Sequence, residues 1–279
     1  MARKRAAPKR CAVNRAELCA FLDETLGIDA IADLSSNGLQ VQGSATVSRV
    51  GCAVDACMAS YRRAVQEQCD LLLVHHGMIW GGLASITGPV YRQVKYLADH
   101  SLNLYAAHLP LDLHPSLGNN AALADLLRLE HRKPFGLYKG ISIGFEGIRR
   151  RAITRDTLVD LLCRSLAAEC TVLPFGPDSI RHIAVVSGGA AGELPEAIEK
   201  KVDCYVTGEP SHENYHAALE AGINVIYAGH YHTEKGGVQG HRRQSRRKTH
   251  HGVADYPVHL IDHDFARSLS IGWFCGGHL

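Results

Sequence analysis

The stretch Leu71-Leu72-Leu73-Val74-His75-His76 decides how the chain is interpreted, because an apolar run of strand length ends in two adjacent histidines. Successive side chains of a regular strand point to opposite faces. Both imidazoles can therefore serve one site only where the strand ends and the backbone turns, and Gly77 follows at that point. The stretch predicts a buried strand that delivers two histidines to a functional site.

Around this stretch, short apolar runs alternate with amphipathic segments, a pattern typical of βα units around a largely parallel or mixed sheet. The predicted fold class is therefore α/β. Asn14 is the expected N-cap of the first helix, with Glu17 three residues later as in a capping box. We expect strands at 47–54, 71–74, 102–106, 170–173, 182–187, 204–206 and 224–227, a strand pair around 140–145, and helices at 14–26, 57–67, 89–99, 119–127, 154–166, 194–200 and from about residue 211.

The same pattern predicts two interleaved α/β lobes that share a metal-binding cleft. We expect a basic tail at 1–13, an α/β domain at 14–239 and an atypical basic C-terminal segment at 240–279. Within the domain, one lobe is expected to contain about 14–130 plus 203–239, and the other 131–202.

The charge distribution argues against a nucleic-acid binder. The chain has 30 Lys and Arg against 28 Asp and Glu, but five of the basic residues lie in Met1 to Arg10 and five in His241 to His250. Without those ten, 20 basic residues face 28 acidic ones, so the folded body is acidic. A groove binder needs its positive charge on a folded face, and both basic runs are better explained as solvated tails or loops.

Cysteine usage and hydropathy predict a cytoplasmic protein. The nine cysteines form no C-x-x-C pair, and their odd number argues against a complete disulfide framework. No apolar run approaches the roughly 20 residues that span a bilayer, and no apolar region follows the basic start as in a signal peptide. We therefore expect neither export nor insertion into a membrane.

Four segments carry candidate metal ligands at suggestive spacings. The spacing i, i+4 places two side chains on one face of a helix about 6 Å apart, although Pro110 argues against a regular helix in the second segment. Imidazole suits zinc, iron, nickel or manganese, and carboxylates can bridge two cations, so the set can build a dinuclear site. The segments hold His75 with His76, His108 with Asp112, His212 with His216, and His230 with Glu234.

Chance pairing is the alternative, since the chain has 17 histidines. For His212 and His216 a surface role and a ligand role are equally supported. For His75 and His76 the ligand role is favoured, because a buried strand seldom ends in two histidines without a reason. Nucleotide-binding loops of the G-x-G-x-x-G or G-x-x-x-x-G-K-[ST] type and the G-x-S-x-G elbow are absent.

Five motifs in this order resemble the Nif-three-like family, whose members are often named GTP cyclohydrolase I type 2 homologues. The resemblance covers roughly residues 14–238, and the motifs together are specific although each alone is weak. They lie at 36–43 (SNGLQVQG), 74–77 (VHHG), 105–112 (YAAHLPLD), 205–209 (YVTGE) and 228–234 (AGHYHTE).

The resemblance implies an α/β fold of two similar lobes, assembled as a toroidal homohexamer with dinuclear metal sites that face an inner cavity. It implies two divalent metal ions per chain, which can be Zn, Fe, Mn, Ni or Mg. His108 becomes a candidate for orienting a metal ligand from outside the site or for facing the substrate. The implied metal ligands are His75, His76, Asp112, His230 and Glu234.

The chain departs from the family after Gln239, where the sequence turns rich in Arg, His and Ser and loses apolar helical periodicity. A change of reading frame near the end of the gene would produce such a segment. Comparison of the underlying nucleotide sequence in its other frames tests this hypothesis.

Two functions compete. The first is a metal-dependent hydrolase for a small-molecule substrate, in which two cations polarise the substrate and activate water. The family name suggests purine-ring opening of GTP, but no guanine or triphosphate motif is present, and a phosphoester or another cyclic amide is equally allowed. The second is a non-enzymatic metal-binding scaffold or metal-handling protein. A ring that encircles nucleic acid is the least supported, because the folded body is acidic.

Overall fold

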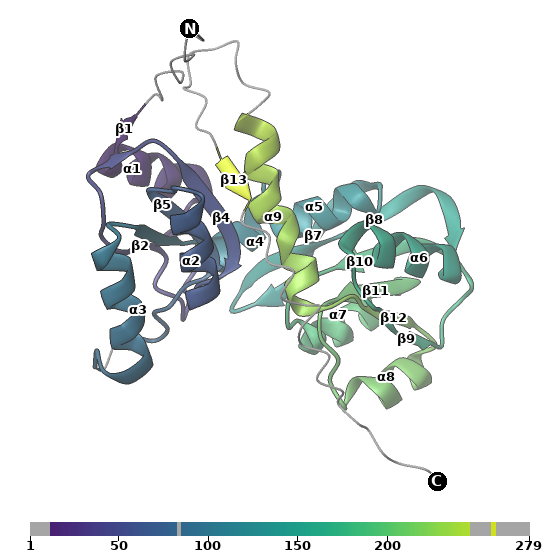
Figure 1. Cartoon of the computed structure of the whole chain (residues 1–279). Coiled ribbons are helices and arrows are strands. Elements are labelled where there is room, and N and C mark those ends of the chain that lie inside the picture. The colour runs from purple at the N-terminus through teal and green to yellow at the C-terminus, as the bar shows by residue number, and fades with distance from the viewer. Residues whose placement is uncertain (1–11, 83–84, 246–257, 261–279) are drawn as a thin grey trace, which may run out of the picture.

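Two lobes, each built on one β-sheet, lie side by side in the computed structural model (Figure 1). The structure describes residues 12–82, 85–245 and 258–260. Both sheets combine parallel and antiparallel strands and are flanked by helices, so the predicted α/β fold class is confirmed.

The first lobe contains a five-stranded sheet in the order β13-β4-β5-β6-β2, parallel except for β2. Leu71 and Leu73 face one hydrophobic cluster, while Leu72 and Val74 face another. Both faces of β5 are thus covered, which explains the uninterrupted apolar run. The elements are β1 Val13–Asn14, α1 Arg15–Leu26, β2 Gly38–Val41, β3 Thr46–Val47, β4 Val50–Asp55, α2 Met58–Gln66, β5 Leu71–His76, α3 Gly88–Asp99, β6 Asn103–Ala106 and β13 Val258–Leu260.

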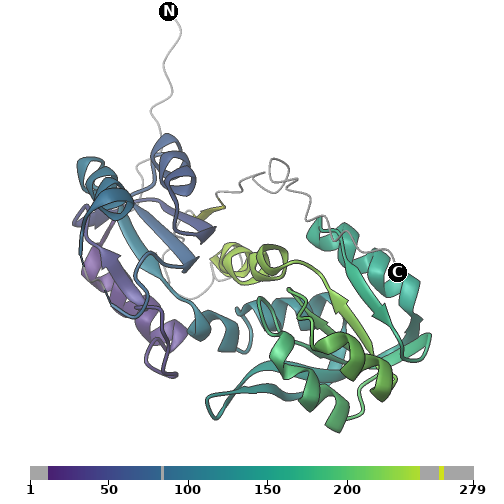
Figure 2. The ribbon, with the colours of Figure 1, turned by 90° about the horizontal axis from the view of Figure 1, so that it is seen from below.

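The second lobe contains a six-stranded sheet in the order β7-β8-β10-β11-β12-β9. Its long β7–β8 hairpin extends toward the first lobe (Figures 1 and 2). The strand pair expected around 140–145 is therefore the tip of a much longer hairpin. The elements are β7 Leu129–Tyr138, β8 Ile141–Thr154, α6 Arg155–Leu166, β9 Thr171–Pro174, β10 Ser179–Val185, a 3-10 turn at Ala191–Glu193, α7 Leu194–Glu199, β11 Cys204–Thr207, α8 Asn214–Ala221 and β12 Asn224–Tyr227.

The division into lobes differs from the predicted one. The strands β11 and β12, expected in the first lobe with the rest of 203–239, pair in parallel with β10 and with each other in the second sheet. Only the following helix, α9 at His230–Ser245, returns to pack against β4 and β5. Figure 2 shows α9 between the two lobes. Short βα units have the same pattern in either sheet, so periodicity cannot assign them.

The predicted boundary between 239 and 240 falls inside α9, which continues to Ser245, and β13 pairs with β4 beyond it. Gln, Arg and His are compatible with a helical backbone, so the missing apolar periodicity did not end the helix. The remainder of the predicted segment 240–279, and with it the hypothesis of a changed reading frame, lies outside the described residues.

Helix ends explain two further differences. The structure forms a short helix, α4 at Leu109–Leu113, in spite of Pro110, because proline is tolerated in a first turn. The helix expected from about residue 211 begins at Asn214, so His212 precedes it. The Asn14 cap is confirmed, since its side chain accepts a hydrogen bond from the backbone of Ala16. None of the described helices is both long and apolar enough to cross a bilayer.

Candidate metal centre

The candidate centre lies where the two lobes meet, at a cavity of about 520 Å³. The first lobe supplies the end of β5 and the segment that follows β6 into α4. The second lobe supplies the loop after β10, and α9 closes the arrangement from its first turn. The cavity lining includes five polar side chains of interest here: His76, His108, Asp112, His230 and Glu234.

Four histidines share one arrangement: each Nδ1 is held by a protein oxygen, which leaves Nε2 for the centre. Such anchoring fixes the ring orientation and is the usual support of a metal-binding imidazole. The pairs are His75 with the Ala107 carbonyl at 3.0 Å, His76 with Asp55 Oδ1 at 2.8 Å, His108 with Asp33 Oδ1 at 2.9 Å and His230 with Glu209 Oε1 at 3.0 Å.

His75 offers a direct test of whether a cation fits. Its side chain is fully buried, and because the Ala107 carbonyl can only accept, Nδ1 carries the proton. Its Nε2 lies 3.5 Å from Asp112 Oδ2 and 3.4 Å from Glu234 Oε1, yet has no hydrogen-bond partner. Buried polar atoms are normally satisfied, so an orphaned Nε2 between two carboxylates fits a metal ligand.

Glu234 is the second strongly buried group, at 2% exposed. Its Oε1 lies 3.0 Å from His230 Nε2, its Oε2 lies 3.3 Å from His76 Nε2, and Oε2 also lacks a hydrogen-bond partner. Only glycine suits position 188 beside this carboxylate. A Cβ at Gly188 would collide with Glu234 Oε1, and the φ of Gly188 is +68°, in the left-handed region. The carboxylate can therefore face ligands on both sides, as a bridging group does.

Asp112 is oriented by its own hydrogen bonds. Its Oδ1 accepts from Asn119 Nδ2 at 2.8 Å and from Ser187 Oγ at 2.9 Å. These two donors, one from α5 (Asn119–Leu126) and one from the loop after β10, leave Oδ2 directed at His75. The second lobe thus helps to aim a carboxylate that belongs to α4.

The centre concentrates negative charge. Burial disfavours charge on His75 and His76, but the carboxylates outweigh it: Asp112 and Glu234 raise the pKa of His75, and Asp55 with Glu234 raises that of His76 to about 10. The hydrogen bond to Glu234 raises the pKa of His230. Burial opposes the charge of Glu234 as well, yet the histidines hold its pKa well below the usual range. An environment that attracts protons this strongly also attracts metal cations.

Two groups of ligand atoms are compact enough to hold an ion, with all atoms of a group within 4.8 Å: His75, His76 and His108, and His76, His230 and Glu234. His108, expected to orient a ligand or to face the substrate, is thus brought into the first group. His212 and His216 are exposed on and before α8 and belong to neither group.

Three supporting carboxylates were not anticipated from the sequence. Asp33, Asp55 and Glu209 anchor histidines from loops or strand ends far away in the chain. Glu209 lies in the motif at 205–209, which is a usable signal, whereas Asp33 and Asp55 carry none.

Comparisons with known proteins agree with this picture. The family model Duf34/NIF3 (NGG1p interacting factor 3) matches residues 13–264. A relative from Archaeoglobus fulgidus, named GTP cyclohydrolase 1 type 2 homolog, is 46% identical over 227 residues, which cover 81% of this chain and 91% of that protein.

Two solved structures are similar throughout. The protein TTHA1606 from Thermus thermophilus has a TM-score of 0.80 at 38% identity, and protein ybgI, described as of unknown function, has 0.82 at 32%. Each comparison covers 90% of this chain and 98% of the other.

The fold and the site define a two-lobed α/β protein with a histidine and carboxylate cluster that can hold metal ions. The chain belongs to the Duf34/NIF3 family. The resemblance identified from five motifs is confirmed.

Proposed function

We propose that this protein is a metal-dependent hydrolase with a dinuclear centre at the junction of its lobes. The observation that carries the proposal is the convergence of three anchored imidazoles, those of His75, His76 and His230, on two buried carboxylates, with Nε2 of His75 left unpartnered between them. The names of the relatives, as homologues of a GTP cyclohydrolase, support a hydrolytic reaction but not its substrate. The proposed ligands are His75, His76, Asp112, His230 and Glu234.

The two compact groups share His76, and one imidazole nitrogen binds one cation. We assign His76 to the group with His230 and Glu234, where its Nε2 lies 3.3 Å from Oε2. His75 then remains for the second ion, with Asp112 and, as an added ligand, His108. Glu234 Oε1, 3.4 Å from His75, connects the two positions.

When bound, two divalent cations would polarise a substrate oxygen and lower the pKa of water toward neutrality. The protein's side chains would position the ions and orient the groups that bind them. Asp112 and Glu234 balance the charge, the Nδ1 anchors prevent ring rotation, and Leu109 and Ile143 shield one side of the cavity from solvent.

Elemental analysis tests the centre first. We expect about two equivalents of a transition metal per chain in the purified protein and loss of at least the ion assigned to His75 and Asp112 in His75→Ala/Asp112→Ala. The matched control is His212→Ala/His216→Ala, which removes two exposed imidazoles and should retain the metal. Equal metal loss in both variants, or no metal in any sample, would contradict the proposal.

Turnover then separates an enzyme from a scaffold. The metal-loaded protein is assayed against GTP, a cyclic amide and a phosphoester, together with Glu234→Ala. Turnover that is lost in a folded Glu234→Ala supports the hydrolase. Bound metal without turnover on any substrate would favour the metal-handling scaffold.

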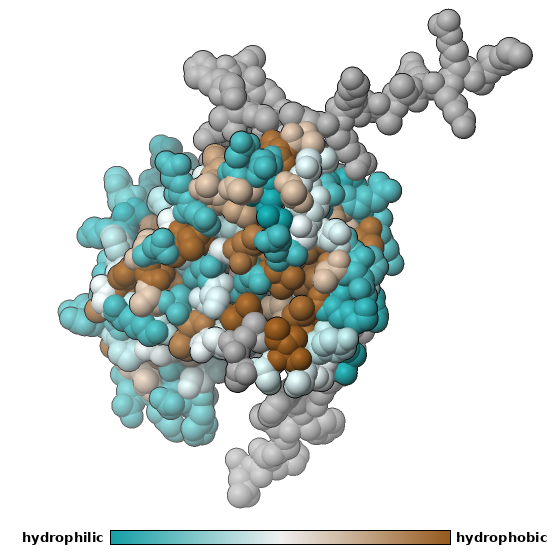
Figure 3. Space-filling model, turned by 90° about the vertical axis from the view of Figure 1, so that its left-hand side faces the viewer, coloured by the Kyte–Doolittle hydropathy of each residue, from teal (hydrophilic) through white to brown (hydrophobic). Residues whose placement is uncertain are grey.

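We also propose that the chain forms a homo-oligomer, with the toroidal hexamer implied by the family resemblance as the expected form. Apolar side chains lie among polar ones on the face of the first lobe (Figure 3). The exposed large hydrophobic residues of the first lobe include Phe21, Leu34, Leu39, Ile86 and Tyr91. Light scattering after gel filtration tests this, and a monomer at micromolar concentration would refute it.

A further inference from the structure

The lining of the cavity includes an indole, that of Trp80, which is both held by a hydrogen bond and partly exposed. Trp80 Nε1 donates to the Gly77 carbonyl at 2.7 Å, and the ring contacts His108 edge to face, with centroids 4.9 Å apart. Nevertheless 42% of Trp80 is exposed. A large aromatic surface that is held rigidly beside candidate ligands, and is not covered, can accept a flat partner at little cost in entropy.

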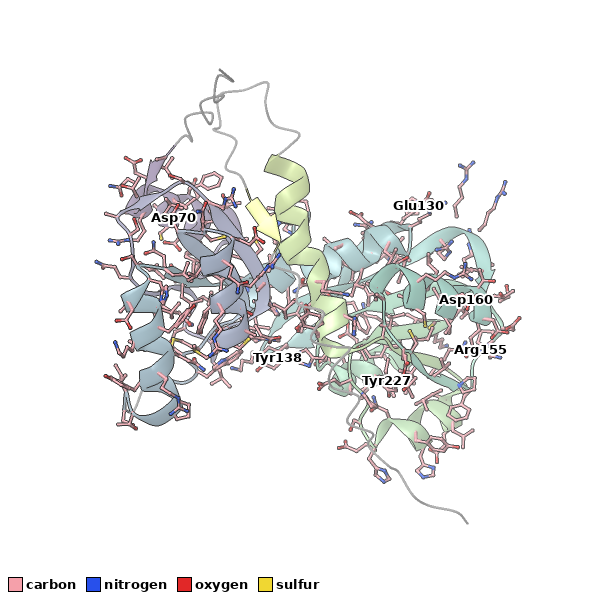
Figure 4. The ribbon with its side chains drawn as sticks, in the orientation of Figure 1. Asp70, Glu130, Tyr138, Arg155, Asp160 and Tyr227 are labelled. Carbon is pink, nitrogen blue, oxygen red and sulfur yellow. The ribbon has the colours of Figure 1, made fainter. Side chains whose placement is uncertain are left out.

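Tyr138 extends this aromatic surface from the other lobe. It ends β7 and lines the same cavity as Trp80, and Figure 4 shows it between the two lobes. Leu109 and Ile143 add apolar area. The cavity therefore has two aromatic rings and two aliphatic side chains at the edge of the metal centre, and its volume of about 520 Å³ is sufficient for a ring system with a small substituent.

The described side chains that line the cavity offer no Lys or Arg partner to a phosphate-rich ligand, and the acidic Glu193 joins Asp112 and Glu234 there. Lys139 contacts the Tyr138 ring, with Nζ 5.2 Å from the centroid, but does not line the cavity. A triphosphate would have only the proposed metal ions as cationic partners, because no Lys or Arg side chain of the described residues lines the cavity to hold the remaining phosphates.

Glu193 provides a polar contact of a different type. It is half-buried, at the end of the 3-10 turn, and burial together with the nearby Glu196 raises its pKa. Glu193 lines the cavity, and its carboxylate oxygens can accept a hydrogen bond from the N–H group of a ring amide.

We propose that the substrate is an uncharged planar heterocycle containing a cyclic amide, which stacks on Trp80 and hydrogen-bonds to Glu193. This rests on the proposed hydrolase function and narrows its substrate class. Water adds its hydroxyl group to the amide carbon and its hydrogen to the amide nitrogen, the C–N bond breaks, and the ring opens to a carboxylic acid and an amine. No oxidant or reductant is required.

Fluorescence of Trp80 tests the stacking. The chain has two tryptophans, so Trp273→Phe leaves Trp80 as the sole reporter. Metal-loaded Trp273→Phe protein is titrated with inosine, with ribose and with inosine triphosphate. We expect saturable quenching by inosine, none by ribose, and an affinity for the triphosphate no more than about threefold higher than for inosine.

Substitutions test whether the ring of the ligand contacts Trp80 and Glu193. By calorimetry, Trp80→Leu should weaken inosine binding about tenfold or more, while Trp80→Phe should retain most of it, as expected for aromatic stacking on a base. Tyr215→Leu, which removes an exposed tyrosine on α8, is the matched control and should have no effect. Glu193→Gln should weaken binding several-fold without changing metal content.

The outcomes separate this inference from the hydrolase proposal because metal content is measured in every sample. Bound metal with no ring-dependent quenching, or a triphosphate that binds tenfold tighter than inosine, would contradict the proposed planar neutral substrate and leave the hydrolase proposal standing. Absence of metal from the wild-type protein would overturn the hydrolase proposal on which it rests.

Discussion

The side chain of Asn119 connects directly to Gly237, 118 positions away, through a hydrogen bond of 2.8 Å from the Gly237 backbone N–H to Oδ1. The same side chain donates through Nδ2 to Asp112 at 2.8 Å. One fully buried amide thus links α4 and α9, the helices that carry Asp112 and Glu234.

Asn119→Ala should therefore damage both stability and metal binding. It removes two buried hydrogen bonds of the Asn119 side chain, to Gly237 and to Asp112, each of which contributes about 0.5–1.5 kcal/mol to the free energy of unfolding. Loss of a ligand-orienting donor should lower metal affinity about 10- to 100-fold. Urea unfolding and metal titration measure the two effects.

Asn224→Ala is the control, because Asn224 is also fully buried and holds loop carbonyls of Pro177 and Asp203. It should lower stability to a similar degree and leave metal affinity unchanged. Equal affinity losses in the two variants would contradict a specific role for Asn119.

Gly237→Ala should lower the melting temperature although alanine favours helices. A Cβ at this position would lie 2.5 Å from Asn119 Oδ1 and 3.0 Å from its backbone nitrogen, so α9 and α5 must separate. Overpacking of this kind costs about 1–3 kcal/mol and exceeds the gain in helix propensity of about 1 kcal/mol. Gly192→Ala, where a Cβ meets nothing within 4 Å, should leave the melting temperature unchanged.

Asp33→Asn should weaken metal binding through His108. Burial opposes the charge of Asp33, but hydrogen bonds from His108 and Asn37 outweigh it and hold the pKa well below its usual range, so the carboxylate stays ionised. The neutral amide should orient His108 less firmly and lower metal affinity about tenfold. Asp29→Asn, an exposed neighbour, should bind metal like wild type, and a similar loss there would point to a general charge effect.

Glu146 should make stability depend on pH. Burial raises its pKa, but hydrogen bonds from Lys200 and His182 outweigh this and lower it below the usual range. Because the folded pKa lies below the unfolded one, the stabilisation is present above the unfolded pKa and disappears as pH falls through the folded pKa. Glu146→Gln should lose about 2 kcal/mol at pH 6 and show a flatter pH profile in urea unfolding.

Glu130→Gln is the matched control for this experiment, since Glu130 is exposed on β7 (Figure 4). It should unfold like wild type at every pH. A wild-type pH profile in Glu146→Gln would assign the acid sensitivity to other carboxylates.

Chelation should lower the melting temperature of the wild-type protein. A ligand that binds only the folded state stabilises it by about 2.7 kcal/mol at 100 times its dissociation constant. His75→Ala/Asp112→Ala should show a smaller chelator-induced shift in differential scanning fluorimetry, because it lacks two ligands of one of the ions. A chelator effect of equal size in the double variant would show that the metal binds elsewhere.

Much of the site could be predicted because its residues lie in short motifs. The end of β5 and the i, i+4 pairs placed the histidines and carboxylates together before any tertiary information. Spacing includes His108 among the candidate ligands, and the family resemblance implies a more distant role for it; the structure brings it into a compact group with His75 and His76, with Nδ1 held by Asp33. The supports Asp33 and Asp55 were missed because their partners lie 75 and 21 positions away.

The fold was predictable in its elements but not in their assignment to sheets. Periodicity identified the strands now seen at β10, β11 and β12, yet pairing among them is a long-range property with no local signal. Pro110 argued against a helix that forms because the proline occupies the first turn. The continuation of α9 into a polar sequence shows that a helix end is not set by apolar spacing alone.

The position of α9 between the lobes has a consequence for the life of the protein. The candidate ligands come from the first lobe and from this helix, which directly follows β12 of the second lobe, so a bound cation would tie the two lobes together. Its removal would expose both inner faces together to proteases. Cellular amounts of this protein would then follow the supply of its metal, even with transcription held constant.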